Sequence, residues 1–160
     1  MPPDARVTVI QPVVPPVVGG SPRPDNEPAH RGANGEAMSA FVEWLLGQGV
    51  DQDTIELLLV LAGKSGGFET PDRIMEPDSW FHFPGNTRFI RIGNCPNGDG
   101  IGIDMTRNPG PVYFIDHERL QLDDIEEISV RVADSLQDYV QKSSKNPDFP
   151  YDYHEAKGLA

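Results

Sequence analysis

Three consecutive residues, Asp116, His117 and Glu118, are of the types that bind metal ions or transfer protons. They follow the apolar run 112–115, so we expect them at the end of a β-strand. Neighbouring side chains on a strand point to opposite faces, and these three could converge on one ion only if the chain bent. The sequence therefore predicts no metal site at this position.

A glycine-rich segment, NGDGIG at residues 97–102, invites comparison with phosphate-binding loops. A G-x-G-x-x-G pattern starting at Gly98 or Gly100 would require a third glycine where the chain has Ile103 or Met105. No G-K-[ST] triplet is present either. We expect no dinucleotide or other phosphate cofactor to bind here.

The same segment also fails as a calcium loop. If Asn97 and Asp99 were the third and fifth positions, the first would be Cys95 and the twelfth Thr106. A calcium loop needs an oxygen ligand at its first position and a bidentate glutamate at its twelfth. The sequence predicts no cofactor and no bound metal.

The single cysteine, Cys95, has no second cysteine for a disulfide or a zinc pair, and no histidine or basic residue lies close to it in the sequence. A G-x-S-x-G nucleophile turn is also absent. We therefore predict no catalytic residue. An enzyme of unrecognised type is the alternative that a deep polar pocket would favour.

The chain is acidic, with 25 acidic and 13 basic residues among 160 and a formal net charge of -12. Residues 37–160 hold 21 of the acidic and 10 of the basic residues, a net charge of -11. Such a surface repels polyanions, which argues against nucleic acid or an anionic membrane as the partner. It attracts a basic protein.

The amino-terminal segment is cut repeatedly by Pro12, Pro15 and Pro16, which does not suit a secretory signal. No apolar run approaches the roughly 20 residues of a membrane span. Together with the lone cysteine, these features predict a cytoplasmic protein.

The chain divides into three parts. Residues 1–35 form a Pro/Gly-rich tail that we expect to be disordered, residues 36–145 a folded domain, and residues 146–160 a frayed carboxyl-terminal tail. Apolar residues at helical spacing predict helices over 36–47 and 53–63, with Asp53 as the N-cap of the second, and a final helix over 130–142.

Alternating apolar residues predict three strands, at 88–92, 100–105 and 112–115, joined by turn-rich segments. A further short strand is expected near residues 80–83, and the acidic segment 121–128 is expected to be a loop or hairpin on the surface. The second strand exposes Gly100 and Gly102 on one face, which would let another backbone approach. The fold class predicted is α+β, a central antiparallel sheet with N-terminal helices and a C-terminal helix packed on it.

Several segments together resemble the SUKH superfamily, which includes fungal cell-wall regulators of the Smi/Knr type and bacterial immunity proteins. They are F-I-x-I-G-N at 89–94, G-D-G-I-G-I-D at 98–104, V-Y-x-x-D-H-E at 112–118 and A-D-S-L-x-D-Y-V at 133–140, with the helix-to-glycine segment 61–68 before them. The resemblance implies an α+β domain without catalytic residues that binds another protein. In bacteria that partner is commonly a toxin.

Our leading hypothesis is an immunity protein that neutralises a basic toxin domain, such as a nuclease. An intracellular adaptor of the same fold, with the Pro-rich tail as a docking segment, is the alternative. We expect the partner to contact an acidic rim, which comprises Asp99, Asp104, Asp116, Glu118, Asp123, Asp124, Glu126 and Glu127.

Overall fold

The computed structural model describes residues 30–76, 88–120 and 124–160, with side chains from residue 35 onward. Within these residues, four strands form one antiparallel sheet in the order β1-β2-β3-β4. Together with the five helices of the same residues they make an α+β fold, as the sequence predicts. The strands are β1 (Phe89–Asn94), β2 (Gly100–Asp104), β3 (Val112–Ile115) and β4 (Ser129–Ala133), and the helices are α1 (His30–Gly47), α2 (Gln52–Leu61), α3 (Pro71–Met75), α4 (Leu136–Lys145) and α5 (Tyr153–Leu159).

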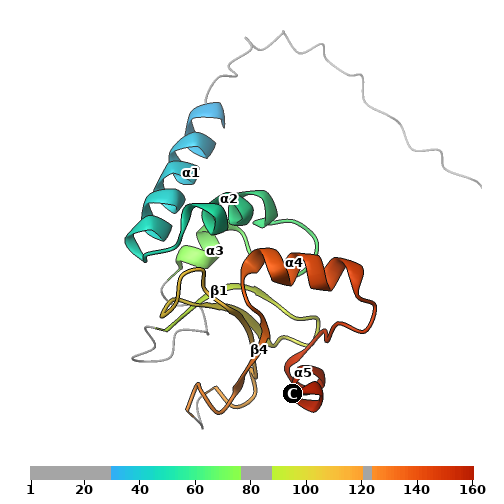
Figure 1. Ribbon diagram of the computed structural model, residues 1–160. Helices are drawn as coiled ribbons and strands as arrows, with labels where there is room; N and C mark the ends of the chain where they lie inside the picture. The colour runs from blue at the N-terminus through green and yellow to red at the C-terminus, as the bar shows by residue number, and fades with distance from the viewer. Residues whose placement is uncertain (1–29, 77–87, 121–123) are drawn as a thin grey trace, which may run out of the picture.

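Helices α1 to α4 lie on one side of the sheet (Figure 1). The main core forms between them and the apolar face of the strands, because each element contributes side chains at its own period. Phe41 and Leu45 come from α1, Ile55 and Leu58 from α2, and Ile92 from β1. All five are almost completely buried.

The two amino-terminal helices are present, but both begin earlier than predicted. Helix α1 starts at His30, inside the segment expected to be tail. Helix α2 is capped by Asp51, whose carboxylate accepts hydrogen bonds from the backbone N–H and the hydroxyl of Thr54. Asp53, the predicted cap, instead lies in the first turn, where its charge favours the helix dipole.

The three predicted strands are confirmed, and a close backbone approach occurs at Gly93 of β1. Gly67 accepts a hydrogen bond from the backbone N–H of Asn94 at 2.8 Å, and a Cβ on Gly93 would lie 2.2 Å from the Gly67 carbonyl oxygen. Gly102, by contrast, is covered by the side chains of Phe89 and Ile115. The predicted backbone approach to the glycine face of β2 is therefore wrong at Gly102.

The helix predicted over 130–142 is wrong in its first part, where the chain forms β4. Val130 and Val132 alternate with the exposed Arg131, a strand pattern inside the segment predicted to be helical. Ser135 then caps α4 by accepting a hydrogen bond from the backbone N–H of Asp138. A strand and a helix joined by two residues resemble one helix in sequence because both carry apolar side chains that pack against the core.

The connection between β3 and β4 covers the second face of the sheet. Its residues Leu120 and Ile128 are buried against Phe89 and Ile115 in a small second core. The segment therefore does more than form the surface loop or hairpin that the sequence predicts. It closes the face left open by the glycines of β2.

The carboxyl-terminal segment is not frayed. Residues 153–159 form α5, in which Tyr153 and Ala156 are buried. Phe149, in the link from α4, contacts Tyr139 of α4 edge to face, with ring centroids 5.5 Å apart. The end of the chain is thus part of the domain.

Some expectations fall outside the described residues: the tail up to residue 29, the short strand near residues 80–83, and Asp123. In the part of the chain that is described, no helix combines the length and the apolar character needed to cross a bilayer.

Candidate functional site

The structure separates the acidic rim into buried and exposed residues. Asp99, Asp104 and Asp116 are at most 1% exposed, so the expectation that they face a partner is wrong. Glu118 is exposed on the β3–β4 connection, as are three residues that we call the acidic turn: Asp124, Glu126 and Glu127. The backbone N–H of Glu127 donates to the carbonyl of Asp124, which closes this turn.

Asp104 is buried, and its carboxylate binds the guanidinium of Arg88. The Nε and Nη2 atoms of Arg88 donate to one Asp104 oxygen at 3.1 and 2.9 Å, and the backbone N–H and hydroxyl of Thr106 donate to the other. Arg88 also donates to Glu126 at 2.6 Å. A single guanidinium thus ties the end of β2 to the acidic turn.

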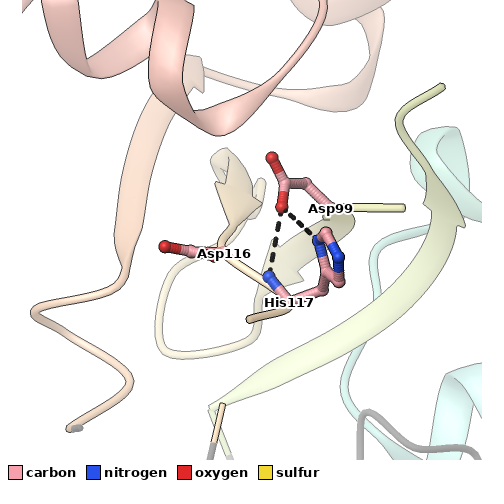
Figure 2. A group of neighbouring side chains, drawn as sticks. All are labelled: Asp99, Asp116 and His117. Atoms are coloured by element: carbon pink, nitrogen blue, oxygen red, sulfur yellow. Dashed lines mark hydrogen bonds and ion pairs between the residues drawn. The ribbon is translucent and has the colours of Figure 1, made fainter. Parts of the chain in front are cut away.

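Asp99 is the centre of a second buried cluster (Figure 2). One carboxylate oxygen accepts from the backbone N–H of His117 at 3.1 Å and lies 2.7 Å from its Nδ1, which must carry the proton if the carboxylate is ionised. The other oxygen accepts from the Asn97 amide at 2.7 Å and the backbone N–H of Tyr153 at 3.1 Å. The cluster joins the β1–β2 turn, the end of β3 and the start of α5.

Hydrogen bonds decide the charge of both buried carboxylates. Burial alone raises the pKa of Asp99, but the donors on Asn97, His117 and Tyr153 outweigh it, so the pKa lies below the ordinary 3.8. Burial also raises the pKa of Asp104, but hydrogen bonds from Thr106 and Arg88 outweigh it, so this pKa is lowered as well. Both groups are therefore ionised at neutral pH, and both are satisfied by internal hydrogen bonds, with the guanidinium of Arg88 as the countercharge of Asp104.

Asp99, Asp116 and His117 have the composition of a metal site, and their potential ligand atoms lie within 4.8 Å of one another. The geometry favours a hydrogen-bonded cluster instead. Both Asp99 oxygens already accept two hydrogen bonds each. Figure 2 shows the Asp116 carboxylate directed away from the Asp99–His117 pair, and it accepts from the backbone N–H of Glu118. A metal ion would have to displace bonds that hold the fold together.

Cys95 lies at the turn that contains Asp99, whose carbonyl accepts its backbone N–H at 2.7 Å. Its thiol is buried, and burial, with smaller contributions from the charges of Asp99 and Asp152, raises its pKa to about 12. A nucleophilic cysteine needs the opposite shift, because the thiolate is the reactive form. Cys95 is therefore suited to the core and not to covalent chemistry.

Sequence reasoning found the acidic residues but not their partners. Asp99 is 18 residues from His117 and 54 from Tyr153 along the chain. No local pattern shows that such residues meet. The only local signal is the turn itself, where Asn97 receives a hydrogen bond from the Asp99 backbone N–H.

Comparisons of this chain with protein-family models, with curated proteins and with solved structures found no match.

Proposed function

We propose that this domain is a non-catalytic protein-binding module of the SUKH type, an immunity protein that neutralises a basic toxin domain in the cytoplasm. The observation that carries the proposal is the acidic turn. It exposes Asp124, Glu126 and Glu127 on a segment that is anchored beneath by the buried Ile128. Fixed charges on an ordered segment attract and orient a cationic partner without a large ordering cost.

The hydrogen bonds that the internal carboxylates already accept support the same proposal. Asp99 and Asp104 are saturated with hydrogen bonds, and Cys95 is held as a neutral thiol. These three groups therefore have structural roles. The resemblance in the strand motifs and the α+β fold agree with a binding module.

The acidic turn also suits a nuclease as the toxin. A nuclease surface is built to hold phosphates through lysine and arginine. Carboxylates presented on a rigid segment offer the same charge to that surface and would occlude it. Glu118, exposed on the same connection between β3 and β4, adds a further charge.

Co-expression with the basic toxin domain that the proposal expects from a neighbouring gene tests the proposal. We expect the wild-type chain to restore growth, and the double variant Asp124→Lys/Glu127→Lys to lose most of this protection. Glu126 is left unchanged because it pairs with Arg88. The control, Glu36→Lys/Glu43→Lys, alters net charge equally at exposed positions of α1.

Two results would contradict the proposal. Absence of protection by the wild-type chain would reject the immunity role. Equal protection by the Asp124→Lys/Glu127→Lys variant and the wild type would reject the acidic turn as the contact.

A further inference from the structure

A groove of about 740 Å³ runs between α2, the first turn of α4 and the loop between β2 and β3. Figure 1 shows α2 and α4 near each other on the same side of the sheet. One wall carries Asp53, Glu56 and Val60 of α2, and the other carries uncharged residues that include Asn108 and Gln137. The volume is in the range of pockets that bind ligands.

Along the wall formed by α2, carboxylate side chains are followed by apolar ones. Asp53, Glu56, Leu57 and Val60 are spaced by three, four and seven residues, which places them on one face of the helix. The carboxylates come first along this face and the apolar side chains follow. The groove therefore offers a negative end and an apolar end.

Among the described residues, the two carboxylates have no cationic partner, and Glu56 accepts one hydrogen bond, from the side-chain amide of Gln52 at 3.2 Å. Asp53 and Glu56 are exposed, and neither forms an ion pair with a described residue. The residues that line the groove include no lysine or arginine. Asp53 favours the dipole of α2, but Glu56 lies beyond the first turn, where that effect has faded. A cation in the groove would relieve the repulsion between them.

The apolar end is also open. Val60 is 54% exposed and is one of five exposed large apolar side chains among the described residues. Leu57 is half-buried beside it. A lysine or arginine side chain has an apolar stem and a charged head, so it can satisfy both ends of such a groove. An apolar neighbour in the same peptide would cover Val60.

We infer that this groove binds a short cationic segment of a protein partner, with lysine or arginine at Asp53 and Glu56 and an apolar side chain on Val60. The inference deepens the proposed function and rests on it for the class of partner. It adds a second contact surface, on α2, to the acidic turn on the β3–β4 connection.

Titration of the ¹⁵N-labelled full chain with the peptide acetyl-Leu-Arg-Leu-Lys-amide tests the inference by NMR. We expect saturable shifts centred on the amides of Leu57, Val60, Asn108 and Gln137. The variant Asp53→Asn/Glu56→Gln should weaken binding at least about fivefold, the sum expected for two exposed charge contacts. Val60→Ser should weaken it about threefold, because part of one apolar contact is lost.

The matched control is Glu36→Gln/Glu43→Gln, which removes two exposed charges from α1 and should leave the affinity within about twofold. Shifts spread over all acidic surfaces, shifts centred on the acidic turn, or an equal loss in the control would overturn the inference. Saturable shifts in the groove on titration with Ca²⁺ alone would make it a cation site and would also overturn it.

The result of the peptide titration can be distinguished from that of the co-expression assay because the titration uses no toxin. Peptide binding in the groove without protection from a toxin would reject the immunity role and keep the groove. Protection by the wild type and by Asp53→Asn/Glu56→Gln alike, without peptide binding, would reject the groove and keep the immunity role.

Discussion

The Asp99 carboxylate accepts a hydrogen bond from the backbone N–H of Tyr153 at 3.1 Å, and so fastens the first residue of α5 to the turn between β1 and β2. Tyr153 continues the link, because its hydroxyl donates to the carbonyl of Glu127 at 3.2 Å. The end of the chain is thereby connected to the acidic turn. The segment that presents the candidate interface is ordered by contacts from two distant parts of the sequence.

Replacing Asp99 with asparagine should destabilise the domain by about 2–4 kcal/mol, because one accepting oxygen becomes an amide donor facing other donors. The amide would oppose either the Asn97 and Tyr153 donors or those of His117. Urea unfolding at pH 7 measures the change. Asp148→Asn, at an exposed position, should stay within about 0.5 kcal/mol. Equal stability of Asp99→Asn and the wild type would show that the cluster does not hold the fold.

Acid should destabilise the wild type in a way that depends on Asp99. The folded-state pKa values of Asp99 and Asp104 lie below the ordinary 3.8, so their stabilisation is complete above that value and is lost as the pH falls through the lowered ones. We expect the free energy of unfolding to fall steeply below about pH 4, and less steeply in Asp99→Asn. Chemical denaturation at a series of pH values measures both slopes. Parallel curves would contradict this assignment.

Removing the charge of Arg88 should cost more than removing that of a surface arginine. Arg88→Met leaves the buried Asp104 carboxylate without its guanidinium, at about 1–3 kcal/mol. Arg73→Met breaks an exposed pair with Glu76 and should cost less than about 1 kcal/mol. Thermal and urea unfolding of both variants give the comparison.

A double variant checks that the Arg88 effect is specific. Because Asp104→Asn removes the charge that Arg88 neutralises, Arg88→Met/Asp104→Asn should be less destabilised than the sum of the single variants. Additive losses would mean that Arg88 acts through other contacts.

The sequence was sufficient for the elements with strong local patterns. Alternation of side-chain type predicts β1, β2 and β3, and helical spacing predicts α2, because the large apolar residues of each element recur on one face at a regular period. It was insufficient for β4, because the spacing of Val130 and Val132 is compatible with a strand or a helix. Only the pairing with β3 shows that the segment is a strand. Tertiary context also made α5 a helix in a segment that reads as polar.

The candidate site could be predicted only in part, for a related reason. Acidic composition predicts exposed charge at Asp124, Glu126 and Glu127, and all three are exposed. It could not distinguish them from Asp99 and Asp104, which are buried because partners from distant segments reach them. Burial of a carboxylate depends on long-range contacts, and a single sequence does not display these.

The most direct test of the account is the affinity of the purified full chain for the proposed basic toxin domain, measured by calorimetry at low and moderate salt. We predict saturable binding that weakens as salt is added. Asp124→Lys/Glu127→Lys should bind at least about 30-fold more weakly, because like charges then face each other across the interface. Glu36→Lys/Glu43→Lys should bind within about threefold of the wild type. No binding by the wild type, or equal binding by the two charge-reversed variants, would contradict the account.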